Sequence, residues 1–217
     1  MLNKINKSFI FMILIWTISS CSNSDVVFYD VTFNSTWSED THPDNFPGNA
    51  HWSGLIGATH NTSYTMWQAG ANASSGMEQM AESGAKSKLI SEIEQAISSG
   101  TVEFKLSGSG MGVSPGSITF NFKINESHPY VSLVAMIAPS PDWFAGVTSV
   151  NLYEGGNWVS TKTITLYAYD AGSDDGTNYT SPNSDTTPKV NIQQIGVSPF
   201  LVSGAIKEVG TFTFTRN

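Results

Sequence analysis

The sequence predicts an all-β fold with one accessory helix and a long ordered loop region. Runs of β-branched and aromatic residues alternate with polar residues at a period of two, which is typical of strands buried on one face. A single segment has the four-residue spacing of an amphipathic helix. Glycine, proline, asparagine and serine cluster between these runs, as they do in turns.

Five segments carry the strand pattern. Residues 26–33 mix β-branched and aromatic side chains, and residues 118–124 alternate isoleucine and phenylalanine with polar residues. Residues 131–137 are almost continuously apolar, which indicates a central strand. Residues 163–169 and 211–215 alternate again, so the strand pattern continues to the end of the chain.

One helix is expected over residues 78–97. Its apolar positions step by four from Ala81 to Ile97, and Gly100 follows as a stop signal. Gly84 weakens the first half by roughly 1 kcal/mol relative to alanine. We expect the apolar stripe to pack this helix on the sheets.

The region 42–70 matches neither a strand nor a helix period. It is rich in tryptophan, histidine, glycine and asparagine. We interpret it as a long ordered segment that wraps over the sheets, with aromatic anchors such as Trp52 and Trp67.

The N-terminus has the pattern of a secretory signal. Lys4 and Lys7 precede an apolar run over residues 9–16 that is too short to span a bilayer, and small residues then precede Cys21. The placement of Cys21 resembles a bacterial lipobox, which implies cleavage before this residue and lipid attachment to it. The alternative is an ordinary signal peptide with an unrelated cysteine.

These features give a signal peptide over residues 1–20, a lipidated tether over 21–25 and a single domain over 26–217. They predict export to the bacterial cell envelope and a membrane contact through the lipid at Cys21. Ser22 gives no inner-membrane retention signal, which favours the outer membrane. Whether the domain faces the periplasm or the exterior stays open.

The cysteine content and the net charge limit the disulfides that the chain can form and the partners that it can bind. Cys21 is the only cysteine, so no disulfide can form within one molecule. The net charge of −8 becomes about −10 when the signal removes two of the ten basic residues against eighteen acidic ones. This acidity argues against a nucleic-acid partner and against charge-driven binding to anionic lipid.

Two acidic segments are the strongest functional signal. Asp142 lies in residues 139–143, after the strand-like run 131–137, and Asp170 and Asp174 lie in residues 169–176, after the run 163–169. If these two strands lie side by side, the three carboxylates converge at one end of a sheet. Two such charges about 4 Å apart repel by roughly 4 kcal/mol at an effective dielectric near 20.

A cation would relieve this repulsion, and an all-oxygen ligand set suits calcium. The spacing does not match an EF-hand, because Asp175 replaces its glycine and Ser181 its final glutamate. From spacing alone, a solvated Asp/Gly turn remains the alternative.

Several motifs follow one another in order over nearly all of the chain after the signal: residues 32–37, 42–43, 46–47, 51–61, 81–84, 128–129, 136–143, 170–176, 181–182 and 211–216. This series resembles the spondin domain of F-spondin and mindin. The similarity implies an antiparallel β-sandwich with one calcium ion at a loop end. It also implies that Asp142, Asp170 and Asp174 are the calcium ligands, and it leaves Asp175 as a candidate further ligand.

The chain lacks the cysteines and the accompanying thrombospondin repeats of animal members, which are secreted adhesion or recognition proteins. The resemblance therefore implies a calcium-binding, extracytoplasmic adhesion or recognition module with a glycan or a surface protein as ligand. The alternative is a structural envelope protein in which calcium only stabilises the loops.

The enzyme-like motifs in the sequence lack features that catalysis would need, so we expect no enzymatic activity. Residues 112–116 fit G-x-S-x-G, but Pro115 has no N–H for an oxyanion hole. His42, His51 and His60 are spaced nine apart, unlike zinc motifs. We expect His51 and His60 to be buried, hydrogen-bonded structural residues.

Overall fold

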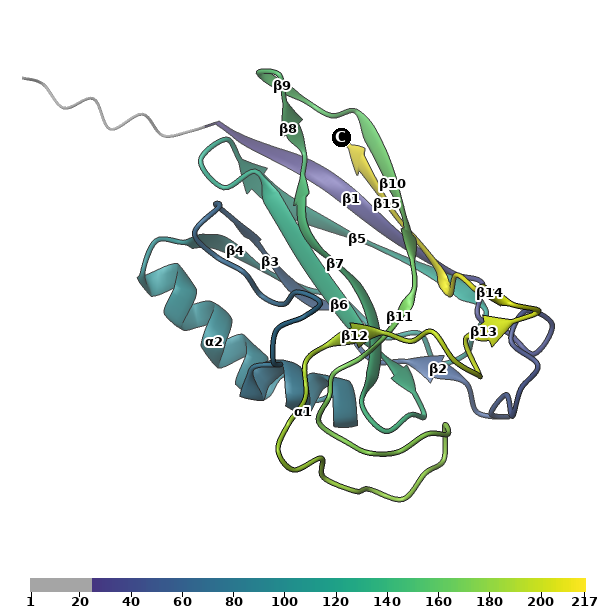
Figure 1. Ribbon diagram of the computed structural model, residues 1–217. Coiled ribbons are helices and arrows are strands. Elements are labelled where there is room, and N and C mark those ends of the chain that lie inside the picture. The colour runs from purple at the N-terminus through teal and green to yellow at the C-terminus, as the bar shows by residue number, and fades with distance from the viewer. Residues whose placement is uncertain (1–24) are drawn as a thin grey trace, which may run out of the picture.

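The computed structural model describes residues 25–217 (Figure 1). The expected signal peptide, Cys21 and most of the tether lie outside the described residues. Within the described part, no helix combines the length and the apolar character needed to cross a membrane.

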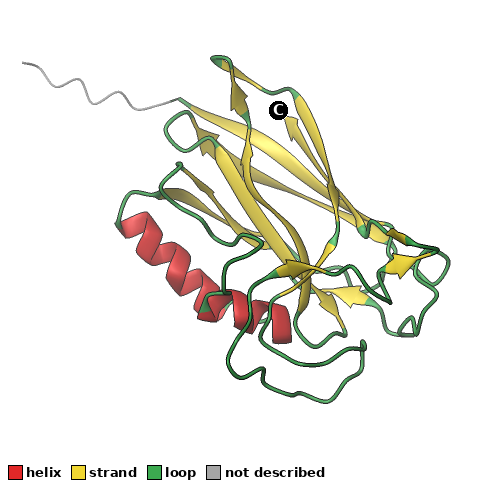
Figure 2. Ribbon diagram, in the orientation of Figure 1, coloured by secondary structure: helices red, strands yellow, loops and turns green. Residues whose placement is uncertain are grey.

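Two antiparallel sheets face each other, which confirms the predicted β-sandwich (Figure 2). The smaller sheet has the order β10-β15-β1-β5. Its strands are β1 (Val26–Ser35), β5 (Gly116–Asn125), β10 (Thr161–Leu166) and β15 (Gly210–Arg216).

The larger sheet has the order β12-β11-β7-β6-β3-β4, and β2 pairs with β6 beside this path. Its strands are β2 (His51–Trp52), β3 (Ile56–His60), β4 (Val102–Ser107), β6 (Tyr130–Ala138), β7 (Trp143–Asn151), β11 (Ala168–Asp170) and β12 (Gln193–Gln194). Two small hairpins complete the strands: β8 (Tyr153–Glu154) with β9 (Asn157–Trp158), and β13 (Leu201–Val202) with β14 (Ala205–Ile206).

The alternation predicted for the smaller sheet is present. Tyr29, Val31 and Phe33 of β1 are buried between the sheets, whereas Thr32 faces outward and bonds Thr119 of β5, with 2.8 Å between the hydroxyl oxygens. The rings of Phe33 and Phe212 meet edge to face at 5.1 Å. The main core of the sandwich therefore lies between the inner faces of the two sheets.

A helical layer covers the outer face of the larger sheet (Figure 1). The helices α1 (Ser75–Ser83) and α2 (Ser87–Ser98) bury Met77, Met80, Leu89 and Ile93 against the sheet. Strand β6 is thus covered on both faces, which explains its nearly continuous apolar sequence.

The helical segment expected over residues 78–97 is divided into two helices. Gly84 has a left-handed backbone with φ of 68°, and its N–H bonds the Met80 carbonyl at 2.9 Å, which ends α1. The second helix begins after Lys86. Most of the stripe packs on the sheet as predicted, because Ala81, Leu89 and Ile93 are buried, but Ala85 and Ile97 are exposed.

Part of the region 42–70 forms strands rather than a wrapping segment. All five residues of β3 are buried, so no alternation marks this strand. A Cβ atom on Gly57 would lie 2.0 Å from the Ser132 carbonyl of the neighbouring β6, so glycine permits the two backbones to approach. Trp52 and Trp67 are buried, as expected of anchors.

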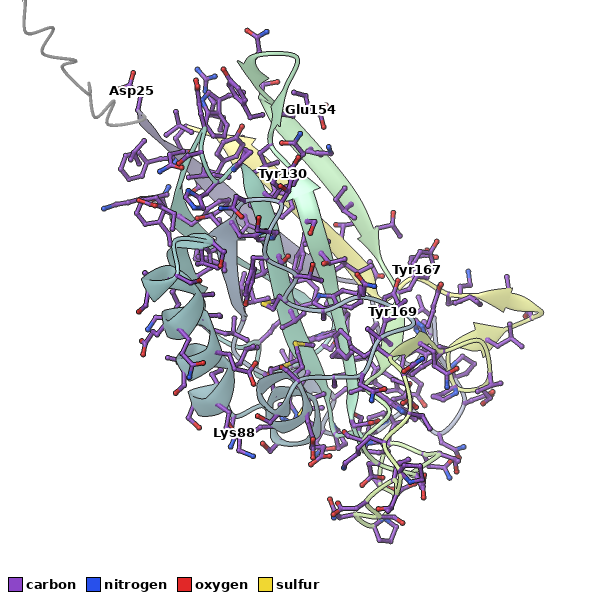
Figure 3. All side chains as sticks on the ribbon, turned by 60° about the vertical axis from the view of Figure 1, so that its left-hand side comes forward. Asp25, Lys88, Tyr130, Glu154, Tyr167 and Tyr169 are labelled. Atoms are coloured by element: carbon purple, nitrogen blue, oxygen red, sulfur yellow. The ribbon has the colours of Figure 1, made fainter. Side chains whose placement is uncertain are left out.

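The strand expected over 163–169 is also divided. β10 belongs to the smaller sheet and β11 to the larger one, so the chain crosses between sheets at Tyr167. Tyr167 and Tyr169 lie close together at this crossing (Figure 3). The crossing brings the end of β11 to the edge of β7, where Asp170 pairs with Trp143.

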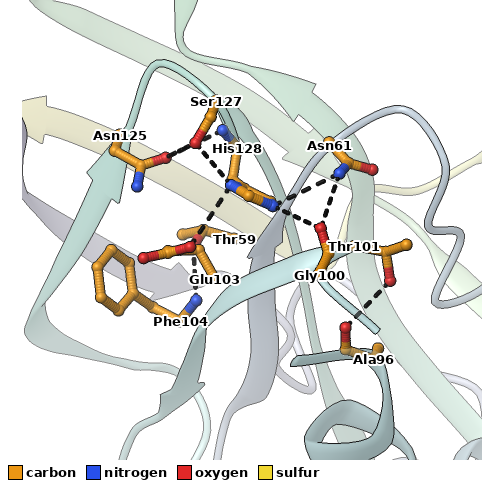
Figure 4. A network of polar contacts seen from close by, with 10 residues as sticks. All are labelled: Thr59, Asn61, Ala96, Gly100, Thr101, Glu103, Phe104, Asn125, Ser127 and His128. Atoms are coloured by element: carbon orange, nitrogen blue, oxygen red, sulfur yellow. Dashed lines mark hydrogen bonds and ion pairs between the residues drawn. The ribbon is translucent and has the colours of Figure 1, made fainter. Parts of the chain in front are cut away.

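Polar contacts around His128 join several segments at the end of the sandwich where β6 begins (Figure 4). Its Nε2 lies 3.1 Å from the Gly100 carbonyl, and its Nδ1 lies 2.9 Å from Ser127 Oγ and 3.6 Å from Glu103 Oε2. This histidine joins the turn after β5, the end of α2 and the start of β4. The acidic segments follow β6 at its other end.

Candidate metal centre

The two acidic segments meet at one end of the larger sheet, but their strands are not neighbours. β7 lies between β6 and β11 in the sheet. Asp142 lies in the short connection from β6 to β7, and Asp170 is the last residue of β11. The pairing of Trp143 with Asp170 brings the two segments together through β7, a strand that the sequence did not reveal.

Asp142 is fully buried, and its two carboxylate oxygens differ sharply. Oδ2 accepts hydrogen bonds from the Ser173 N–H at 2.7 Å, the Asp174 N–H at 3.0 Å and the Ser173 hydroxyl at 3.2 Å. Oδ1 is buried and has no hydrogen-bond partner among the described residues. Burial, reinforced by the nearby charge of Asp170, raises the pKa of Asp142 to about 6.

Asp170 and Asp174 use backbone N–H groups to hold the loop. Asp170 Oδ1 accepts from the Gly172 N–H at 2.7 Å. Asp174, which is 4% exposed, accepts from the Gly176 N–H at 2.7 Å and the Ser184 N–H at 2.8 Å. Burial raises the pKa of Asp170, and the charges of Asp174 and Asp175 add to that rise.

Asp175 is more exposed than the other three aspartates. Its side chain is exposed, and its Oδ1 accepts a hydrogen bond from the Thr186 hydroxyl at 2.7 Å. Its backbone N–H bonds the Ser184 carbonyl at 2.8 Å. Asp175 thus connects two parts of the long β11–β12 loop (residues 171–192) in this conformation.

The donor chemistry of the site fits a hard cation such as calcium. Asp142, Asp170 and Asp174 supply only carboxylate oxygens, and Asp142 Oδ1 is a buried acceptor that has no donor among residues 25–217. Across residues 25–217, no three histidine, cysteine, aspartate or glutamate side chains are grouped closely enough to hold a metal ion as they stand.

Glu82 is an acidic neighbour that the sequence analysis did not identify. It lies in the last turn of α1, and its Oε1 is buried without a hydrogen-bond partner in the described chain. Burial raises the pKa of Glu82; the nearby Ser173 and the charge of Lys189 oppose the rise, and the charges of Glu78 and Asp142 add to it. Helix spacing cannot reveal this proximity, because α1 reaches the loop only in the folded molecule.

A lysine balances part of the acidity. Lys189 Nζ donates to the Ser173 carbonyl at 2.9 Å and pairs with Glu78 Oε1 at 3.2 Å. It connects the β11–β12 loop to the first turn of α1. Sequence reasoning gave this residue no role, since neither contact is local.

The structure separates the other sequence candidates from this site. His60 is fully buried and bonded to Ser132 Oγ at 2.8 Å, which confirms its expected structural role. His51 is only partly buried and lies at a pocket, so the expectation of burial was wrong for it. Ser114 of the G-x-S-x-G match is buried, and its hydroxyl donates to the Trp37 carbonyl at 2.6 Å.

Comparisons with known proteins extend over most of the chain. The family model described as Spondin_N matches residues 27–200. Spondin-2 of Rattus norvegicus is 35% identical over 184 residues, which cover 83% of this chain and 56% of that protein. Spondin-2 of Homo sapiens is 35% identical over 181 residues, with 82% and 55% covered.

Spondin-1 of Gallus gallus is 33% identical over 201 residues, which cover 87% of this chain and 25% of that protein. The chain thus spans about half the length of the two Spondin-2 proteins and a quarter of Spondin-1. The matched region contains all three buried or partly buried aspartates of the site.

Proposed function

The chain belongs to the Spondin_N family, and on that premise we propose that it is a calcium-binding adhesion or recognition module of the cell envelope. One observation carries the calcium part of the proposal. Asp142 Oδ1 is a carboxylate oxygen that is buried and has no partner in the described residues, a costly arrangement that a cation would relieve.

Asp142, Asp170 and Asp174 are the residues that would hold the ion. Calcium takes six to eight oxygen ligands, so backbone carbonyls and water would supply those that the three carboxylates do not. A bound ion supplies positive charge among acids that repel one another. Two hydrogen bonds within the chain, from the Ser173 and Asp174 N–H groups, hold the Asp142 carboxylate in place.

We assign the ion a role in stability and not in chemistry. The β11–β12 loop spans residues 171–192 with no regular strand or helix, and the only cysteine lies outside the described part of the chain. An ion at a hundred times its Kd would stabilise the fold by about 2.7 kcal/mol. Recognition of a partner would then depend on the surface of the module and not on the ion.

Calcium titration with Asp142→Asn tests the site. Calorimetry should give one ion per molecule for the natural chain, and the variant should weaken binding at least about tenfold, since it removes a charged ligand. Asp40→Asn is the matched control, because Asp40 is exposed and its side chain forms no ion pair with the described residues. Equal affinity of the natural chain and Asp142→Asn would refute the assignment.

The recognition role rests on family membership, and its partner would be a glycan or a surface protein. The net charge of −8 disfavours nucleic acid. The burial of Asp142 and Asp174 favours a second candidate, a structural envelope protein in which calcium only braces the loops. Chelator-sensitive binding on glycan arrays and cell surfaces supports recognition, and a uniform blank supports the structural role.

We also propose export and a lipid anchor at Cys21. The support comes from the sequence pattern before Cys21, and from β1, which begins five residues after it. The domain would therefore be held close to the membrane. Metabolic labelling with palmitate should mark the natural chain and fail for Cys21→Ala; undiminished labelling of the variant would exclude the anchor.

A further inference from the structure

A pocket of about 470 Å³ lies beside the candidate metal centre. The last turn of α1 forms one side with Glu82 and Gly84, and His51 of β2 forms another. Met136, Ala138 and Pro139, from β6 and the connection after it, provide apolar surface. The pocket thus combines a few polar groups with an apolar wall, as small ligand sites do.

The ionisable side chains that line this pocket offer hydrogen-bond acceptors. The Nδ1 atom of His51 lies 2.7 Å from the Asn49 carbonyl, which can only accept, so Nδ1 carries the proton and Nε2 of the neutral ring is an acceptor. An ionised carboxylate such as Glu82 also only accepts. The pocket lining includes no lysine or arginine.

Lys86 approaches the rim of the pocket, but its ammonium already forms hydrogen bonds elsewhere. Its Nζ lies beside Gly54, which lines the pocket, and bonds Ser107 Oγ at 2.9 Å and the Gly108 carbonyl at 3.2 Å. These bonds direct its ammonium toward the end of β4. The Glu82 carboxylate forms no ion pair with it.

The end of α1 adds negative potential. Ser83 is the last helical residue, Gly84 caps it, and the last turn contains no basic side chain. The partial negative charge at a helix C-terminus, about half an elementary charge, is therefore uncompensated by the helix itself. Glu78 and Asp142 add negative charge near Glu82, and Lys189, which is paired with Glu78, offsets part of it.

We propose that this pocket binds the lysine side chain of a partner protein. The ammonium has three donors, which match Glu82, His51 Nε2 and a carbonyl at the end of α1. The methylene stem would lie along Met136, Ala138 and Pro139, as lysine stems do on apolar surface. The inference rests on the proposed recognition function and gives its partner a chemistry.

The overall charge supports a basic partner. A chain of net charge −8 attracts basic surfaces at long range, and an acidic pocket then selects the residue that enters. Arginine fits less well, because its planar fork prefers a carboxylate that it can contact through two parallel bonds. His51 and Glu82 present two separate acceptors.

Methyl NMR of the purified protein tests the proposal, with Nα-acetyl-lysine methylamide as the probe and the Met136 methyl group as the reporter. We expect a saturable shift of the Met136 signal, and at least about tenfold weaker binding for Glu82→Gln. Glu39→Gln is the matched control, because Glu39 is exposed and forms no hydrogen bond or ion pair through its side chain.

The Nε-acetylated probe has the same stem without the charge and should produce no saturable shift. An equal response to both probes, an unchanged affinity in Glu82→Gln, or no response to lysine would each overturn the proposal. Calcium calorimetry on the same sample reports separately on the metal site, so failure of the pocket and failure of the calcium assignment give different results.

Discussion

The two carboxylate oxygens of Asp142 differ in their hydrogen bonding. Three donors satisfy Oδ2, and none in the described chain satisfies Oδ1. Leaving a buried acceptor unpaired costs roughly 1–3 kcal/mol, and more when it is charged. A cation bound to Oδ1 would offset this cost, so the proposed calcium site depends most on this atom.

His60 provides a residue-scale prediction about pH. Burial lowers the pKa of His60 below its ordinary 6.5, with a smaller contribution from His128. The unfolded chain therefore binds the proton more tightly, so the stabilising contribution is present above pH 6.5 and is lost as pH falls below it. Urea unfolding from pH 7.5 to 5 should show a smaller loss of stability in His60→Gln than in the natural chain.

Parallel pH profiles for His60→Gln and the natural chain would contradict this prediction. His51→Gln is the control, because His51 is partly exposed and its ring bonds only the Asn49 carbonyl. The comparison separates the effect of burying the His60 ring from the effect of losing a histidine.

At the residue scale, sequence reasoning found the aspartates but not their neighbours. Asp142, Asp170 and Asp174 stand in loops after strand-like runs, and that position could be predicted. Glu82 and Lys189 approach Ser173 from a helix and from the distant end of the loop. Such contacts depend on how layers pack, which no local pattern records.

At the element scale, glycine decides where two strands can meet. β3 and β6 pair closely at Gly57, where a Cβ atom would lie 2.0 Å from the Ser132 carbonyl. Gly57→Ala must push the strands apart, so we expect a loss of about 2–3 kcal/mol in unfolding free energy, within the range of overpacked cores.

Gly48→Ala is the matched control for Gly57→Ala. Nothing lies within 4 Å of the position its Cβ would occupy, and we expect a change below about 0.5 kcal/mol. Chemical denaturation measures both variants. Equal stability of the two would show that the close approach at Gly57 is not required.

The elements that could be predicted are those with one solvent-facing side. β1, β5 and β15 alternate because the outer face of their sheet is open, whereas β3 and most of β7 are buried on both faces and lack the signal. The apolar stripe predicted the helical segment but not its division into two helices. Gly84 ends α1 because its left-handed backbone forms the C-terminal cap.

At the scale of the whole molecule, three layers hold the functional end in place. The smaller sheet, the larger sheet and the helices enclose two cores, one on each side of the larger sheet. β6 runs from the network at His128 to the acidic segments, so these two regions lie at opposite ends of the strand (Figure 1). The loops of the candidate metal centre therefore rest on a rigid strand.

A crystal structure of the protein grown with calcium, with anomalous scattering recorded for the ion, would show whether Asp142 binds calcium. We expect one anomalous peak about 2.3–2.6 Å from Asp142 Oδ1, with oxygens of Asp170 and Asp174 turned toward it. A structure at saturating calcium in which Asp142 Oδ1 contacts no ion would contradict it.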